Sequence, residues 1–163
     1  MKKSTLPITP ERTCGTCTKC CDGTLTGQVN GVPFFKGMPC HYCLIDNGCS
    51  IYEDRPEDPC RKFKCSYLTD YSVPEWMKPN ISGAIVYERG TNGFTYPALM
   101  PNSEDVSANV LTWYILWALN KYGHAVWYNS QGSRFYLGSP ELGMALDLEA
   151  EESLMNIGRN TNA

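Results

Sequence analysis

Apolar side chains recur at helical spacing in one long stretch of the C-terminal half of the chain. This spacing places them on one face of a helix, which we predict to run from about residue 104 to residue 122. Asn102 or Ser103 can cap its start, and Gly123 can end it. The apolar stripe consists of Val106, Val110, Trp113, Leu116 and Trp117, widened by Leu111, Ile115 and Leu119.

Shorter apolar runs on both sides of this helix are bounded by turn residues and predict β-strands. A second, weaker helix is predicted over residues 140–156, where Gly143 lowers the helix propensity. Two strand pairs are expected, residues 81–88 with 94–100 around a turn at 89–93, and residues 125–128 with 134–137 around a turn at 129–133.

The N-terminal part shows little periodicity and is rich in glycine and proline. Its one recognisable element is a hairpin over residues 27–35, with Asn30-Gly31 as the turn. We therefore expect its order to come from crosslinks or metal rather than from a large core. The predicted organisation is an N-terminal arm (1–13), a cysteine module (14–70) and an α+β part (71–163). The predicted fold class is α+β, with the irregular cysteine-rich module packed on a small β-sheet with one long helix.

Composition narrows the class of protein. The chain has 163 residues, of which 42% are hydrophobic, and this suits one folded domain or a small module fused to a modest one. The net charge of −3 provides no broad basic surface, which disfavours nucleic acid as a partner. No apolar run approaches the roughly 20 residues that a membrane-spanning helix needs, and prolines interrupt the place of a signal-peptide core. We therefore expect no membrane partner and a cytoplasmic location.

The strongest chemical signal is a concentration of nine cysteines in the N-terminal part. Thiols stay reduced in the cytoplasm, so this concentration favours metal binding over disulfides. In a secreted chain the same residues would instead suggest four disulfides and one odd thiol. The candidate metal ligands are Cys14, Cys17, Cys20, Cys21, Cys40, Cys43, Cys49, Cys60 and Cys65.

The cysteine spacing is compatible with more than one kind of metal centre. Two Cys-x-x-Cys turns can build a four-thiolate zinc site, and four cysteines can equally hold an iron–sulfur cluster. The adjacent pair Cys20-Cys21 is more informative, because neighbouring side chains tend to point apart. Two sites that share this segment, or one multinuclear cluster, would both explain the pair. A zinc finger with paired histidines is excluded, since His41 and His124 are too far apart in the sequence.

The run Cys14-Gly15-Thr16-Cys17-Thr18-Lys19-Cys20-Cys21 resembles the signature of the CxxCxxCC family. The later segments Cys49-Ser50-Ile51-Tyr52-Glu53-Asp54-Arg55-Pro56 and Cys60-Arg61-Lys62-Phe63-Lys64-Cys65 resemble that family's second half. Cys40 is similar in position to another family cysteine, whereas Cys43 and the longer gap before Cys60 are departures. The resemblance implies chelation of zinc or of an iron–sulfur cluster. The family includes flagellin lysine N-methylases, but most members have no assigned activity.

These observations lead to a main hypothesis and two alternatives. The main hypothesis is a metal-binding protein that chelates zinc or an iron–sulfur cluster, with Cys43 as the reserve among the nine ligands and His41 as a possible substitute. The second is an iron–sulfur redox protein or a protein-modifying enzyme, and the third is a structural adaptor that binds a protein partner. The sequence contains no recognisable S-adenosylmethionine or nucleotide loop.

Arg55 has two interpretations. It could donate hydrogen bonds to cluster sulfurs or to an anionic ligand. We favour instead a structural role, either an ion pair with Glu53, Glu57 or Asp58, or the fixing of the turn before Pro56.

Overall fold

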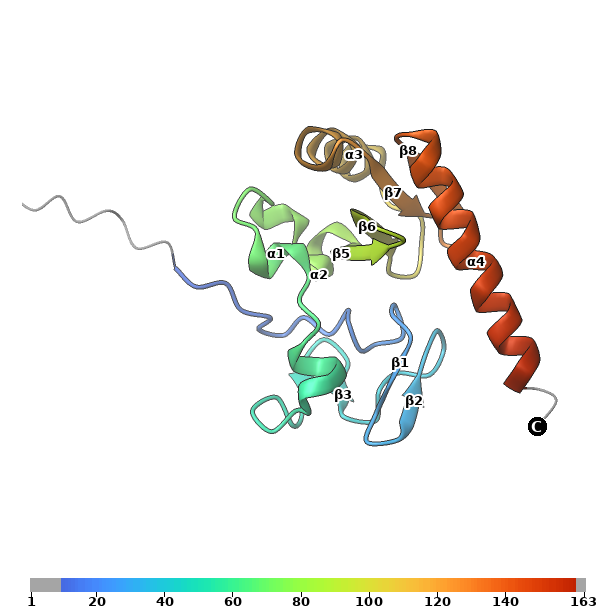
Figure 1. Ribbon diagram of the computed structural model, residues 1–163. Coiled ribbons are helices and arrows are strands. Elements are labelled where there is room, and N and C mark those ends of the chain that lie inside the picture. The colour runs from blue at the N-terminus through green and yellow to red at the C-terminus, as the bar shows by residue number, and fades with distance from the viewer. Residues whose placement is uncertain (1–9, 161–163) are drawn as a thin grey trace, which may run out of the picture.

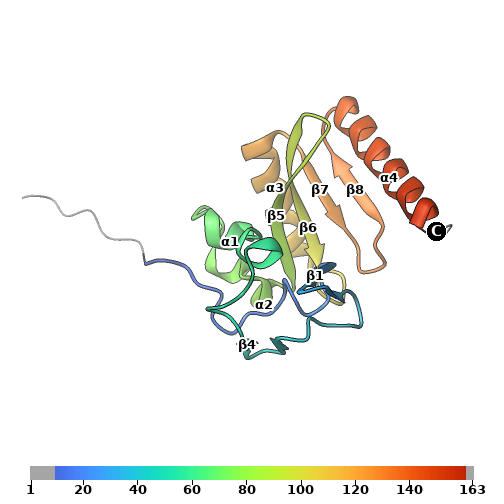
Figure 2. The same cartoon turned by 60° about the horizontal axis from the view of Figure 1, so that its bottom comes forward.

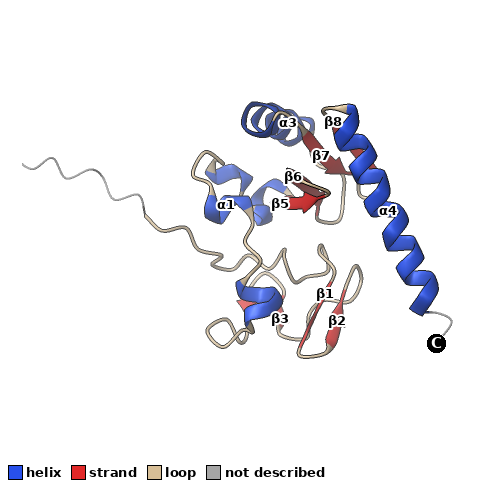
Figure 3. Ribbon diagram, viewed as in Figure 1, coloured by secondary structure: helices blue, strands red, loops and turns tan. Residues whose placement is uncertain are grey.

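The computed structural model describes the chain from residue 10 to residue 160, and its side chains as far as residue 156. Helices and strands are mixed, which confirms the α+β class (Figure 1). The sheet with its long helices forms one part of the molecule. The cysteine segment lies against it and consists mostly of loops and turns (Figure 3). Among the described helices, none is both long enough and apolar enough to cross a lipid bilayer.

A four-stranded sheet organises the C-terminal part, in the order β5-β6-β7-β8 (Figure 2). Strands β5 (Ala84–Thr91) and β6 (Phe94–Pro101) form a hairpin, and so do β7 (Ala125–Tyr128) and β8 (Arg134–Leu137). The bounds predicted for the second pair are confirmed. Strand β5 begins later than predicted, because residues 79–82 form a helical turn that ends at Gly83, with φ +78°.

Helix α3 (Ala108–Tyr122) connects β6 to its parallel neighbour β7. The predicted end at Gly123 is confirmed, and that residue has the left-handed φ of +77° that favours glycine. The predicted start near residue 104 is wrong, because the Ser107 side chain accepts the Val110 N–H at 3.3 Å and caps the helix there. The fully buried face contains Val110, Tyr114 and Ala118, whereas the predicted core residue Leu116 is 65% exposed.

Helix α4 (Pro140–Asn160) covers the opposite face of the sheet and is longer than α3 (Figure 1). Alternate strand residues divide between the two faces, since Leu99 packs with α3 and Ala98 packs with Leu142 and Leu146 of α4. The second predicted helix, over residues 140–156, is therefore confirmed, and it extends to Asn160. Gly143 has a packing reason, because a Cβ there would lie 2.2 Å from the Tyr136 hydroxyl oxygen on β8.

Tyr114 joins α3 to the two central strands. Its side chain is fully buried, and its hydroxyl oxygen lies 2.6 Å from the Val126 carbonyl oxygen and 2.8 Å from the Pro97 carbonyl oxygen. The Val126 N–H donates back to the hydroxyl at 3.2 Å. The parallel ladder between β6 and β7 pairs Ala98 with Val126 and Leu99 with Trp127. The Tyr114 hydroxyl adds a further link between these two strands.

We expect Tyr114→Phe to lower the free energy of unfolding by about 1–3 kcal/mol, since buried backbone groups would lose their partner. Urea denaturation followed by circular dichroism measures the change. Tyr122→Phe is the matched control, because the Tyr122 hydroxyl bonds Glu88 in an exposed position and its loss should cost less than about 0.5 kcal/mol. Equal midpoints for the two variants would contradict this account.

The cysteine module has a small core of its own. The predicted hairpin is confirmed as β1 (Gly27–Val29) and β2 (Val32–Phe34), with positive φ at Asn30 and Gly31. Buried residues Val29, Phe34 and Cys40 form the module's hydrophobic cluster. The remaining elements are short: β3 (Cys43–Leu44), β4 (Gly48–Cys49), η1 (Glu57–Arg61), α1 (Ser66–Thr69), η2 (Glu75–Met77) and α2 (Pro79–Ser82).

Several contacts attach the module to the rest of the chain. Most of the predicted N-terminal arm lies outside the described residues, but Arg12 is described and donates hydrogen bonds to the Tyr67 and Asp70 carbonyl oxygens. Tyr67 itself belongs to the hydrophobic core beneath α3. At the hairpin end, Lys36 Nζ donates to the Ser130 carbonyl oxygen at 2.9 Å. These contacts hold the cysteine segment against the sheet.

Candidate metal centre

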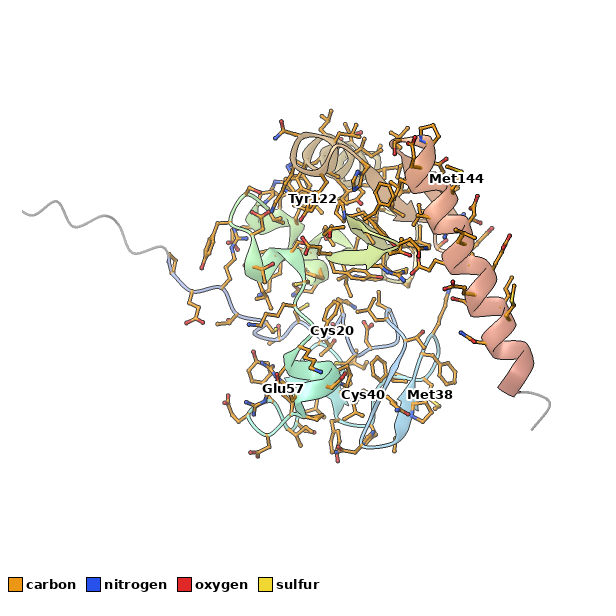
Figure 4. The ribbon with its side chains drawn as sticks, viewed as in Figure 1. Cys20, Met38, Cys40, Glu57, Tyr122 and Met144 are labelled. Atoms are coloured by element: carbon orange, nitrogen blue, oxygen red, sulfur yellow. The ribbon has the colours of Figure 1, made fainter. Side chains whose placement is uncertain are left out.

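A cavity of about 200 Å³ lies where the cysteine module meets the C-terminal part. Pro79 of α2 and Ile85 of β5 belong to its lining, so both parts of the chain are needed to form it. Figure 4 marks Cys20 and Cys40, which belong to its wall. The cysteines that line this cavity are Cys14, Cys17, Cys20, Cys21, Cys40, Cys49, Cys60 and Cys65.

Two consecutive tight turns position the first four cysteines. The Cys17 N–H donates to the Cys14 carbonyl oxygen at 3.0 Å, and the Cys21 N–H donates to the Thr18 carbonyl oxygen at 2.9 Å. Thr18 is almost fully buried and anchors the second turn. The left-handed φ of +57° at Gly15 permits the first turn, because a side chain would strain the backbone there.

The other four lining cysteines come from separate elements. The Cys40 N–H donates to the Cys21 carbonyl oxygen at 2.8 Å, which ties its loop to the first group. Cys49 ends β4, and Cys60 lies in η1. Cys65 occupies the N-cap position of α1. The fold therefore gathers thiols that are up to 51 positions apart in the sequence (65 − 14).

Two other predicted ligand candidates do not line the cavity. Cys43 lies opposite Cys49 across the β3–β4 pair. His41 is exposed, and its ring lies against Tyr42 at 3.9 Å between centroids. Neither residue belongs to the cavity wall.

The adjacent cysteines Cys20 and Cys21 share the cavity. The Cys21 thiol donates to the Thr18 carbonyl oxygen at 3.3 Å, and both cysteines line the cavity although they are neighbours in the sequence. The interaction between the two adjacent thiols raises the pKa of Cys21 and lowers that of Cys20.

Burial affects the other thiols of the wall. It raises the pKa of Cys17 and Cys60, and it raises the pKa of Cys65 to about 11. These three groups are therefore protonated near neutral pH in the metal-free protein. A metal has to displace their protons in order to bind them as thiolates.

The spacing of the donors limits the kind of centre that fits. All nine cysteines are free thiols. Within residues 10–160, no three His, Cys, Asp or Glu side chains converge closely enough to hold a single metal ion. Eight of the thiols nevertheless line one cavity. Soft sulfur donors are typical ligands of zinc and of iron–sulfur clusters.

Of the two structural roles expected for Arg55, the ion pair is not formed. Across the described part of the chain, no carboxylate oxygen lies within 4.0 Å of its guanidinium. The guanidinium carbon lies 3.7 Å from the centre of the Tyr52 ring instead, and both residues line the cavity. The neighbouring acidic residue Asp58 pairs with Lys62. The nearby carboxylates are thus left to other partners or to solvent.

Comparisons of this chain with protein-family models, with curated proteins and with solved structures found no match. The function therefore has to be argued from the cavity and the residues around it.

Proposed function

We propose that this protein binds a multinuclear metal centre, of the iron–sulfur type, through the cysteines that line the cavity. The observation that carries the proposal is that eight of the nine cysteines line one cavity without forming disulfides. The resemblance to the CxxCxxCC family points in the same direction. The alternative is that the same thiolates bind zinc.

Cysteine can also serve as a small buried hydrophobe, and that role has to be weighed against metal binding. The module is a poor candidate for such packing, because its hydrophobic cluster contains three buried residues, one of which is Cys40. A bound centre would supply the cohesion that this small core does not. Free thiols at this density also require a reducing compartment, and we propose the cytoplasm.

Exposure of Cys20 favours a second candidate function, electron transfer or modification of a protein partner. A centre ligated by an exposed cysteine would lie within reach of a partner or substrate. Lysine N-methylation, as in some members of the resembled family, is one such reaction. A purely structural centre has no need for an exposed ligand.

Anaerobic purification with iron, zinc and acid-labile sulfide analysis tests the proposal. We expect iron and sulfide in comparable amounts and a broad absorption near roughly 400 nm. A colourless preparation with stoichiometric zinc would replace the cluster by zinc sites and rule out the redox function. Protein that takes up neither metal, even after reconstitution under reducing conditions, would contradict the proposal.

Metal binding should strengthen as the pH rises. Cys17, Cys60 and Cys65 have raised pKa values in the metal-free protein, so each binds metal only after it releases a proton. The apparent affinity should therefore rise by about tenfold per pH unit for each proton released, below the thiol pKa values. Competition with a chelator of known pH dependence between pH 6 and about 8 measures this slope. An affinity independent of pH would mean that these thiols are not ligands.

A further inference from the structure

The wall of the cavity carries basic residues as well as thiols. Among the described residues that line the cavity, none is an aspartate or a glutamate, although the chain as a whole has a net charge of −3. The lining therefore differs in charge from the chain as a whole. The basic residues of the lining are Arg55, Arg61, Lys64 and Lys78.

Three of these cations have no carboxylate partner within the described chain. Ion pairs at other positions satisfy cations such as Lys62 and Lys121, but none involves Arg55, Lys64 or Lys78. The Arg61 guanidinium, by contrast, is used structurally, because it donates to the carbonyl oxygens of Arg55 and Glu53.

Arg55 and Lys78 approach the thiols from different elements. Arg55 is half-buried and lines the cavity together with the thiols, with its guanidinium carbon 3.7 Å from the centre of the Tyr52 ring. Lys78 precedes α2, and its Nζ lies 3.6 Å from the position that a Cβ on Gly15 would take. The amine is therefore beside the Cys14–Cys17 turn.

We propose that Arg55 and Lys78, with Lys64 at the rim, form an anion-binding wall, and that its ligand is a thiolate-ligated metal centre of net negative charge. This inference rests on the proposed function. A [4Fe–4S]2+ core bound by four thiolates keeps a net charge of about −2, and such a charge is costly to hold in a partly buried cavity without compensation. The wall provides that compensation, and charges next to a cluster also adjust its reduction potential.

The metal-loaded protein provides the first test. Arg55→Gln and Lys78→Gln remove one positive charge each, Arg55→Lys preserves it, and Lys62→Gln is the control because Lys62 is exposed and paired outside the cavity. We expect the glutamine variants to lose metal to a chelator at least about threefold faster and to have a lower reduction potential. Arg55→Lys should recover part of the difference, and Lys62→Gln should match the wild type. Unchanged metal loss and potential in both cavity variants would overturn the inference.

The metal-free, reduced protein provides a second test, which does not require that the protein binds metal. Its thiols are reacted with an anionic disulfide, 5,5′-dithiobis(2-nitrobenzoate), and with a neutral one, 4,4′-dithiodipyridine. The wall should favour the anionic reagent, and the anionic-to-neutral rate ratio should fall with added salt and in the double variant Arg55→Gln/Lys78→Gln. Circular dichroism checks that the variants are folded, and the ratio cancels general changes in thiol accessibility.

The two tests separate the inference from the proposed function. If no metal binds but the rate ratio depends on Arg55 and Lys78, the proposed function is wrong and the anion-binding wall remains. If metal binds and neither readout responds, the wall is wrong and the proposed function remains. Saturable binding of inorganic phosphate to the loaded protein, lost in Arg55→Gln, would overturn the choice of ligand, since the cations would then serve a separate oxyanion.

Discussion

Removing the metal is expected to unfold residues 14–65 and to leave the sheet of residues 84–137 folded. The physical reason is the difference between the two cores. The module has three buried residues in its hydrophobic cluster, whereas the sheet is packed on both faces, by α3 and by α4. A segment with so little buried apolar surface cannot offset the entropy of ordering its chain without another source of binding energy.

Hydrogen exchange of the anaerobically prepared protein, with and without a strong chelator, measures this difference. Amides of the turns at Cys17 and Cys21 should lose most of their protection on chelation, while amides of β6 and β7 should keep theirs. Retained protection throughout the module would mean that metal does not hold it together.

Single cysteine variants refine the same prediction. Cys17→Ser and Cys40→Ser each remove a thiol from the cavity wall, and each should lower metal affinity at least about tenfold. Cys43→Ser is the matched control, because Cys43 is a nearby cysteine outside the lining, and it should retain the metal content of the wild type. If Cys43→Ser loses as much metal as the other two variants, the division of the cysteines proposed above is wrong.

Leu146→Ala is expected to be the most destabilising single substitution in the sheet's outer layer, with a loss of about 2–5 kcal/mol. Leu146 is fully buried and packs with Tyr96, Ala98 and Val126, so its truncation leaves a cavity between α4 and the sheet. Thermal or urea unfolding measures the loss.

Met144→Ala provides the control on the same helix. Met144 is 60% exposed, and its truncation should change the stability by less than about 0.5 kcal/mol (Figure 4). A comparable loss in both variants would indicate that α4 is not docked through the face that contains Leu142 and Leu146.

Local signals in the chain were sufficient for much of the fold. The turn residues Asn30-Gly31 predicted the β1–β2 hairpin, and apolar runs on either side of residues 129–133 predicted β7 and β8 with their observed bounds. Gly123 marked the end of α3. In each case the deciding interaction joins residues close in the sequence, such as a tight turn or a helix cap.

The same reasoning placed the start of α3 incorrectly and included one exposed residue, Leu116, in a stripe that otherwise mostly packs against the core. Several polar residues precede the helix and could cap it. In the structure Ser107 is the N-cap, because its side chain accepts the Val110 N–H. Tyr114 replaces Leu116 as the core residue because its hydroxyl meets the carbonyl oxygens of β6 and β7, which are not its neighbours in the sequence. Hydrophobicity alone could not anticipate a polar group satisfied by a distant strand.

For the candidate site, residue types and spacing predicted that the nine cysteines are metal ligands. Spacing could not separate Cys43 from the other eight, nor reveal that Arg55 lines the same cavity and has no carboxylate partner among the described residues. Those features depend on how β3, β4, η1 and α2 pack around one cavity. Distances between such segments follow from the whole fold, because each loop is positioned by contacts with residues far from it along the chain.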